Sequence, residues 1–461
     1  MADANPTEKF FLSLSTRTWS RDSHGLFDYE SEQTRHLNAI LDENIYIGRK
    51  KHEILPIKDV QNFNQEDEIL FEIKHEQNSN KYILDSPVPI KIEPTQKNIN
   101  DLSNKIWYIL KNDPLKSNNS KQMVVNTNDD YYLCKNDVIK LGRVKYSINE
   151  INIPSRGNNI EAVPPLSDIK KYDIDNLNKN TEPVFNFIFN GKDASEYNDI
   201  PDDEKICKIC YSDENNRESN PLVHLCNCNG GLRFSHFMCI KKWMETKLLI
   251  KENNKKTVKC YFIKSFNCEI CKTPYPFKFK LTGIEKPFEL IDLQKPIGRD
   301  YIILESLNQV KDNCNIKCIH VIQLNNDDLI IGRGHESDIR INDISVSRNH
   351  AKLKYNQENG TILLRDLKSK FGTLVLIKKP LEIKEKKIHI QIGRTYIECW
   401  LMSLEELNKL REEKRAKSLN KQKHQSYQNQ GQNIDNNINK ENNNMDIEEN
   451  NKEEILFIQN K

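Results

Sequence analysis

Seven cysteines and one histidine follow one another at short intervals in the middle of the chain, and this spacing constrains the fold more than any other feature. They form four pairs, each with one or two residues between its members: Cys207 and Cys210, Cys226 and Cys228, His236 and Cys239, and Cys268 and Cys271. Thiolate and imidazole groups so close in sequence can bind one tetrahedral zinc ion. Eight groups supply two sites, so the pattern predicts a small module built around two structural zinc ions.

The composition of the 461 residues narrows the other possibilities. Only 37% of the residues are apolar and the mean hydropathy is −0.74, so part of the chain should remain outside any folded core. The net charge of +2 gives no general electrostatic field for nucleic acid. Most cysteines lie between residues 200 and 275 at metal spacing, which favours a reducing compartment over a secreted, disulfide-bonded protein.

The N-terminus has no apolar signal core, and no segment approaches the roughly 18 apolar residues of a membrane span. We therefore expect a soluble protein of the cytoplasm, with the nucleus as the alternative, and neither a membrane nor a nucleic acid as a partner.

The intervals between the four pairs are fifteen, seven and twenty-eight residues, and the histidine is the fifth of the eight groups. This arrangement resembles the RING-CH family of ubiquitin ligases. The resemblance implies a cross-brace, with one ion held by Cys207, Cys210, His236 and Cys239 and the other by Cys226, Cys228, Cys268 and Cys271. With every position filled by protein, both ions would be structural and would activate no water, and their removal should unfold the segment.

The same resemblance implies three residues that contact a ubiquitin-conjugating enzyme. Ile209 lies between the first two ligands, and Trp243 lies on a stretch, residues 239–249, whose apolar spacing predicts a helix with an exposed face. Lys272 follows the last ligand, where the family has a cationic residue, more often arginine, that hydrogen-bonds the enzyme and ubiquitin. Catalysis would then proceed by positioning, without a nucleophile on this chain.

Two features near the zinc ligands depart from the family. The interval of twenty-eight residues is slightly long, and we expect its polar part, residues 251–259, to be a surface insertion. His224 and Cys260 are spare ligand candidates in this region. Cys314 and Cys318 have metal-like spacing without a second pair, so we interpret them as plain thiols.

A plant-homeodomain finger, which reads histone tails, is the competing interpretation of the zinc ligands, because it has the same ligand order. The single residue between the third and fourth ligands and the seven before His236 fit RING-CH better, and Trp243 fits only RING-CH. Chromatin reading would also need an aromatic cage, which the sequence does not display.

A second set of motifs lies in residues 299–402, where β-type runs at short intervals predict a β-sandwich. The turns between the runs carry Gly332-Arg333, Ser347-Arg348-Asn349-His350, and the segment 366–373 with Gly372. These three motifs, in this order, resemble the forkhead-associated (FHA) domain, a phosphothreonine-binding β-sandwich.

The FHA resemblance implies a role for each of these turns. Arg333 and Ser347 match the phosphate contacts, and a guanidinium and a hydroxyl suit a phosphate of charge near −2. Lys370 would add a third charge and Arg348 would assist. Three residues would support the loops: Gly332, His350 and Gly372. Phe371 replaces the asparagine that grips the peptide backbone in the family, which puts affinity or sequence preference in question.

The other regions resemble no family. Residues 1–160 are β-rich, and the similarity of NIYIGR (44–49) to DLIIGR (328–333) leaves open whether they are a diverged FHA-like copy or only strands that end in a glycine turn. Residues 161–203 have the composition of a linker. Residues 403–417 predict a surface helix, and the Asn/Gln-rich residues 418–461 predict a disordered tail.

The predicted molecule is thus multidomain and mainly β, with a small α+β zinc module at residues 204–280 and an FHA-like sandwich at residues 299–402. Together the two resemblances imply an E3 ubiquitin ligase that recruits a ubiquitin-charged conjugating enzyme and selects targets phosphorylated on threonine. The alternative is a phospho-dependent adaptor whose zinc module is only structural. Exposure of Ile209, Trp243 and Lys272 would distinguish the two.

Overall fold

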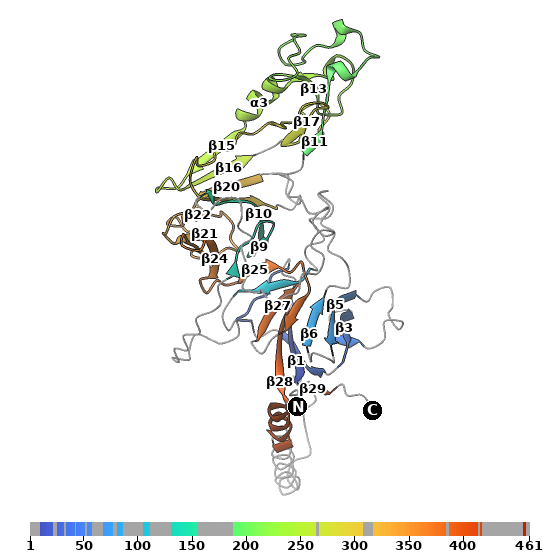
Figure 1. The fold of residues 1–461 in the computed structure, drawn as a ribbon. Helices are drawn as coiled ribbons and strands as arrows, with labels where there is room; N and C mark the ends of the chain where they lie inside the picture. The colour runs from blue at the N-terminus through green and yellow to red at the C-terminus, as the bar shows by residue number, and fades with distance from the viewer. Residues whose placement is uncertain are drawn as a thin grey trace, which may run out of the picture. The chain divides into compact units, whose positions relative to one another are not determined.

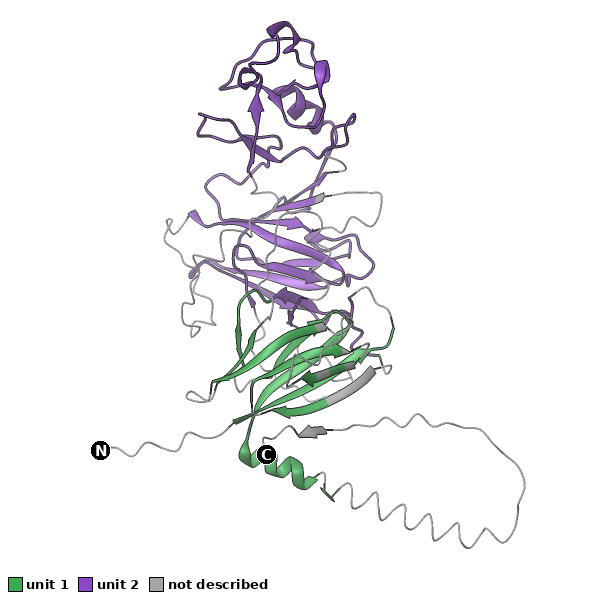
Figure 2. Cartoon of the chain, turned by 90° about the vertical axis from the view of Figure 1, so that its right-hand side faces the viewer, with its two compact units in different colours: residues 1–22, 31–89, 377–461 green, residues 23–30, 90–376 purple. Residues whose placement is uncertain are grey.

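The computed structural model describes residues 10–21, 25–31, 34–41, 43–50, 53–57, 68–76, 81–85, 105–110, 131–154, 188–263, 267–307, 317–383, 387–413, 415–416 and 455–457. The chain divides into two compact units, coloured separately in Figure 2. Unit 1 consists of residues 1–22, 31–89 and 377–461, and unit 2 consists of residues 23–30 and 90–376. Strands dominate both units and helices are few, so the mainly β fold expected from the sequence is confirmed.

Unit 2 contains a β-sandwich. One of its sheets has the strand order β15 (Leu248–Glu252), β16 (Val258–Ile263), β20 (Lys317–Gln323), β19 (Tyr301–Ser306), β10 (Val144–Asn152), β9 (Val138–Leu141), β25 (Thr373–Leu376) and β7 (Trp107–Ile109). The other has the order β22 (Ile339–Arg340), β21 (Leu329–Gly332), β23 (Ala351–Asn356), β24 (Thr361–Asp366) and β8 (Tyr131–Tyr132). Alternating apolar residues from both sheets, such as Ile148, Leu304 and Leu353, pack into one buried core.

This sandwich draws strands from distant parts of the sequence. β25 pairs with β7 and β9, and β24 pairs with β8. The strands at residues 107–109 and 131–152 therefore complete the same sandwich as the strands between Tyr301 and Leu376, a pairing that strand-like periodicity alone does not reveal.

The β15–β16 hairpin falls inside the long interval between Cys239 and Cys268, and Figure 1 shows it beside β20. β16 pairs with β20 along its whole length, so the hairpin extends the sandwich sheet. The expectation of a surface insertion at residues 251–259 is wrong at its end, where Val258 is buried, whereas residues 254–256 are exposed. The expected helix at 239–249 is also shorter, since α3 (Phe237–Glu245) ends before β15 begins.

The zinc-ligand region of unit 2 is built from short elements around two small cores. Its strands are β11 (Ile188–Asn190), β12 (Lys192–Asp193), β13 (Leu222–His224), β14 (Ser235–His236), β17 (Lys278–Lys280) and β18 (Phe288–Glu289), and its 3-10 turns are η5 (Ala194–Glu196), η6 (Asp202–Glu204) and η7 (Gly230–Leu232). Ile240 and Met244 on α3 face a cluster that includes Phe279. β11 and β12 come from the last part of the predicted linker, whose residues 161–187 lie outside the described part of the chain.

Unit 1 contains two sheets. One has the order β27 (Ile388–Ile392), β28 (Thr395–Ser403), β1 (Phe10–Trp19), β2 (Thr34–Leu41) and β29 (Ile455–Phe457), and the other has the order β26 (Leu381–Ile383), β6 (Lys81–Asp85), β5 (Glu68–Glu76), β3 (Ile45–Lys50) and β4 (Glu53–Ile57). The buried Tyr82 hydroxyl donates to the Phe10 carbonyl, 3.1 Å away, and so joins the two sheets.

The predicted surface helix is helical at residues 404–413 and 415–416. It is more than a solvated helix, because Leu407 is fully buried against Phe11 and Met402. Of the predicted disordered tail, β29 pairs in parallel with β2, and the remaining residues lie outside the described part of the chain.

Candidate functional site

The eight zinc-ligand candidates gather in two groups of four. Within each group the donor atoms lie within 4.8 Å of one another, and the groups are Cys207, Cys210, His236 and Cys239, and Cys226, Cys228, Cys268 and Cys271. These are the two sets that the cross-brace pairing implies. The Cys228 and Cys268 sulfurs are 3.6 Å apart, close to the separation of two sulfurs on one tetrahedral zinc ion.

Two of the pairs lie in the same kind of tight turn. The Cys207 amide donates to the Ser212 carbonyl at 2.9 Å, and the Cys268 amide donates to the Thr273 carbonyl at 2.8 Å. In each turn the residue after the second cysteine, Tyr211 or Lys272, has a positive φ near 60°. The left-handed residue turns the chain back so that both sulfurs of the pair point to one side.

His236 is oriented for metal binding. Its Nδ1 lies 3.2 Å from the Cys210 sulfur, and its Nε2 donates to the carbonyl of Glu214. A partner on the second ring nitrogen fixes the tautomer and leaves the lone pair of Nδ1 for an ion. The ring is almost completely buried, so its orientation is held by packing as well.

Lys208 supplies positive charge between the ligands of the second group. Its ammonium donates to the Cys226 sulfur at 3.3 Å and lies 3.9 Å from the Cys268 sulfur. Burial alone would lower the pKa of Lys208, but the thiolate of Cys226 and those of its neighbours raise it overall. A four-thiolate site carries excess negative charge, which this lysine offsets.

The spare candidate His224 has a different task. Its Nδ1 hydrogen-bonds the Tyr197 hydroxyl at 2.8 Å, and its Nε2 donates to the Cys228 carbonyl at 3.1 Å. Both ring nitrogens are therefore engaged, and the ring supports the second group from outside. The other spare candidate, Cys260, lies in β16 of the sandwich sheet.

The residues expected to contact a conjugating enzyme reach the surface. The Ile209 side chain is 44% exposed and Lys272 is exposed, with its ammonium on the Glu269 carbonyl at 2.7 Å. Trp243 is half-buried, with its ring edge against Tyr275 and the Lys247 ammonium 4.0 Å from its centre. Trp243 thus packs on the module core and is only partly exposed.

The FHA-type turns converge at one end of β21 and β23, where His350 braces them. The fully buried imidazole accepts from the Ser347 amide through Nδ1 (3.0 Å) and donates through Nε2 to the Gly372 carbonyl (3.1 Å). Gly332 allows the closest approach, because a Cβ there would lie 2.0 Å from the Arg348 carbonyl oxygen. Gly372 has φ +71°, a conformation that favours glycine.

The charged side chains of these turns are exposed above this frame. Arg333, Arg348 and Lys370 are exposed, and Ser347 is half-buried with its Oγ accepting from the Lys370 amide at 3.1 Å. Lys370 forms an ion pair with Asp28 at 3.6 Å, a partner that the motifs did not indicate. Its ammonium also lies 5.5 Å from the centre of the Phe371 ring.

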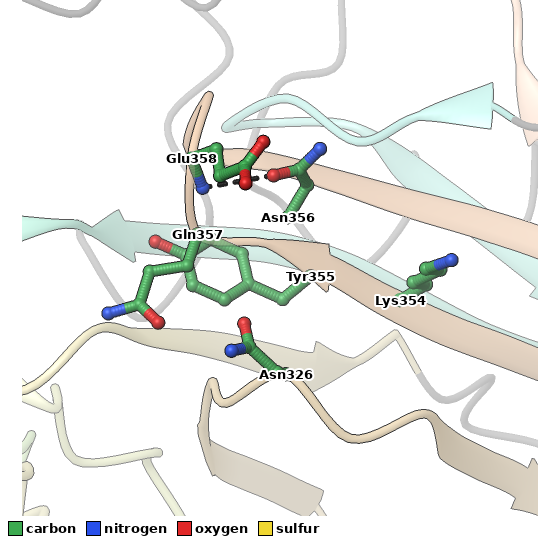
Figure 3. A pocket seen from close by; sticks show the side chains of 6 residues that line it. All are labelled: Asn326, Lys354, Tyr355, Asn356, Gln357 and Glu358. Atoms are coloured by element: carbon green, nitrogen blue, oxygen red, sulfur yellow. Dashed lines mark hydrogen bonds between the residues drawn. The ribbon is translucent and has the colours of Figure 1, made fainter.

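The pocket shown in Figure 3 is separate from these turns. It is lined by Asn326, Lys354, Tyr355, Asn356, Gln357 and Glu358. His350 immediately precedes β23 and the pocket lies at the opposite end of that strand, roughly 17–20 Å away at about 3.3 Å per residue. It lacks the arginine, serine and histidine of the turns, so we assign it no part in the candidate site.

Comparison with known proteins matches these two regions separately. A model of the RING-variant domain matches residues 207–271, and a model of the FHA domain matches residues 329–393. The chain carries a RING-variant domain and an FHA domain. The expected resemblances are thereby confirmed, and zinc binding follows for the module that holds the two cysteine groups.

Several similar proteins are named as E3 ubiquitin-protein ligases. The ERAD-associated E3 ubiquitin-protein ligase DOA10 of Saccharomyces cerevisiae is 30% identical over 104 residues, which are 22% of this chain and 7% of that protein. The E3 ubiquitin-protein ligase MARCHF1 of Homo sapiens is 27% identical over 122 residues, 26% of this chain and 36% of that protein. The chain thus spans only a minor part of these relatives.

A solved structure from a structural and functional analysis of phosphothreonine-dependent FHA domain interactions is also similar. It is 29% identical, with 18% of this chain and 86% of that chain covered, at a TM-score of 0.12. Within the described part of the chain, no helix is both long and apolar enough to cross a membrane.

Proposed function

We propose that the chain is an E3 ubiquitin-protein ligase of the RING-CH type whose FHA domain binds targets phosphorylated on threonine. The observation that carries the proposal is the combination of two four-ligand groups with Ile209 and Lys272 exposed beside them. We assign one structural zinc ion to each group, with all eight side chains as ligands. The zinc ions would hold the turns in place, and no step of the reaction would take place on them.

The ligase reaction would depend on positioning. Ile209 and the half-buried Trp243 would offer apolar contacts to a ubiquitin-conjugating enzyme. Lys272, which is exposed in the turn of the last ligand pair, would offer a cation. Holding the conjugating enzyme and the ubiquitin that it carries in one orientation favours attack on that ubiquitin by a lysine of the target. No covalent intermediate forms on this chain. Lysine forms single hydrogen bonds where arginine forms a fork, so Lys272→Arg should increase transfer.

The FHA turns would select the target. A phosphothreonine carries a charge near −2, which suits the exposed Arg333 and the Ser347 hydroxyl, with Lys370 and Arg348 close by. On binding, Lys370 would exchange the carboxylate of Asp28 for the phosphate. The structural residues of these turns would be Gly332, His350 and Gly372.

Autoubiquitination by the full chain, across a panel of conjugating enzymes, tests the ligase proposal. Ile209→Ala should lower the rate by about tenfold or more, because it removes an exposed apolar contact without disturbing a core. Cys207→Ser should abolish transfer by disrupting a zinc-ligand group. The matched control is Ile297→Ala, since Ile297 is 96% exposed and lies outside the zinc-ligand groups.

Ile297→Ala should retain the full rate. If the zinc-loaded chain forms no ubiquitin conjugates with any enzyme of the panel, the ligase proposal fails and the phospho-dependent adaptor replaces it.

A further inference from the structure

A third group of metal-type donors lies on the sandwich sheet, outside both zinc-ligand groups. Cys260 is on β16, and Cys318 and His320 are on the neighbouring strand β20. Cys260 stands directly opposite His320 in the antiparallel register, and Cys318 precedes His320 by two residues. Side chains two residues apart on a strand share a face, so the three point to the same side of the sheet.

The three donor atoms are close enough to share one ion. The Cys260 and Cys318 sulfurs are 3.0 Å apart, and the His320 Nε2 lies 3.3 Å from the Cys318 sulfur and 4.0 Å from the Cys260 sulfur. All three lie within 4.8 Å of one another, as do the members of the other two groups. Thiolates and a neutral imidazole are the donors that zinc prefers.

These three side chains are buried beside an apolar core. Cys260, Cys318 and His320 are buried at 7%, 9% and 1% exposure, on the face that joins the apolar core of the sandwich. The Nε2 atom of His320 faces the sulfurs of Cys318 and Cys260, which are weak hydrogen-bond partners. Burying an imidazole against such weak partners costs free energy, which a bond from Nε2 to a metal ion would offset.

We propose that Cys260, Cys318 and His320 bind a third zinc ion, held in the core of the sandwich sheet. Binding would release the two thiol protons to solvent and place three protein ligands around the ion, which leaves a fourth position for water. A disulfide between the two cysteines would need the sulfurs about 2.05 Å apart and would have no use for the histidine.

The site would connect two parts of unit 2. Cys260 belongs to the hairpin inserted between the zinc-ligand pairs of the RING-variant domain, whereas Cys318 and His320 belong to a sandwich strand. A shared ion would therefore fasten the hairpin to β20 in addition to their backbone hydrogen bonds. Neither RING-CH ligands nor FHA phosphate contacts include these residues, so the third site does not depend on the proposed ligase function.

The third site is tested by comparing the zinc content of the full chain between wild type and variants that lack one of its ligands. Wild type purified in zinc and then desalted should hold about three zinc ions per chain, and Cys318→Ser and His320→Asn about two each. Cys399→Ser is the control, because Cys399 is also buried but lies in unit 1, and it should match wild type. The difference in zinc content between wild type and variants can still be measured if the two RING-variant groups are only partly occupied.

Cobalt substitution gives a second readout that does not depend on the stoichiometry. The difference spectrum between wild type and His320→Asn, both loaded with Co²⁺, should contain the absorption bands of a site with two thiolates. Equal zinc contents in wild type and the two variants, with no cobalt difference spectrum, would overturn the proposal. So would a Cys260–Cys318 disulfide found by mass spectrometry in wild type purified without reductant.

Discussion

The position of the exposed Arg333 side chain depends on the backbone of the neighbouring FHA turn. Its amide donates to the Ser347 carbonyl at 3.0 Å, so the backbone of one FHA turn fixes the other. The guanidinium itself is exposed, which leaves it to a ligand at small desolvation cost. Its contribution should therefore be to binding and not to folding.

Arg333→Ala should weaken binding of a degenerate phosphothreonine peptide library by about 10- to 100-fold, because it removes a charge-assisted hydrogen bond to phosphate. Fluorescence anisotropy measures the affinity, with the unphosphorylated library as reference. Arg340→Ala is the matched control, since Arg340 is exposed on β22 of the same sheet. Equal affinities for wild type and Arg333→Ala would contradict the assigned role.

Sequence alone was sufficient where the chemistry is local. Zinc ligands within a pair lie two or three positions apart, so spacing identifies them and the structure groups them in the two expected sets. It was insufficient where partners are distant in sequence. Cys260 and Cys318 are 58 positions apart, and only the strand register brings their sulfurs together. The contact of Lys208 with the second ligand group was not predicted either, because a lysine between ligands has no distinctive spacing.

At the scale of elements, the β15–β16 hairpin is the main departure from expectation. Its sequence is polar, with a lysine- and asparagine-rich turn, which is typical of a surface loop. The structure keeps the turn at the tip, where the Asn253 side chain accepts from the Thr257 and Val258 amides. The alternation that follows, with Val258, Cys260, Tyr261 and Ile263 buried, is a strand covered on both faces.

Tyr261 makes the hairpin part of the core. Its ring is fully buried with Ile303 and Ile319, and its hydroxyl accepts from the Gln294 amide at 2.9 Å. Tyr261→Ala should lower the melting midpoint of unit 2 by about 10 °C, because the cavity costs roughly 3–5 kcal/mol. Circular dichroism or scanning calorimetry of the full chain measures it.

Ile250→Ala is the control for Tyr261→Ala, since Ile250 is on β15 of the same hairpin but is 43% exposed. Its melting midpoint should stay within about 2 °C of wild type. Equal, small shifts for both variants would show that the hairpin is not integral to the sandwich.

At the scale of the molecule, the order of motifs along the chain is a poor guide to its compact units. Unit 1 combines residues from both ends of the chain, and the sandwich of unit 2 includes strands from residues 107–152. Periodicity predicts that these segments are strands, but pairing over more than two hundred positions is decided by tertiary packing. The expected boundaries at residues 160 and 299 therefore remain predictions about domains, whereas the mainly β class is confirmed.

Zinc removal should separate the two activities that we propose. The RING-variant region has small cores and depends on its metal-ligand groups, whereas the FHA turns rest on the large apolar core shared by the two sandwich sheets. Treatment with a high-affinity chelator should therefore abolish ubiquitin transfer while changing phosphothreonine-peptide affinity by less than about threefold. Both are measured on the same chelated sample, and a sample reloaded with zinc serves as the control. A parallel loss of peptide binding would mean that the FHA turns need bound zinc to fold, and His320→Asn, which removes only the proposed third site, would show whether that zinc is the one in the sandwich.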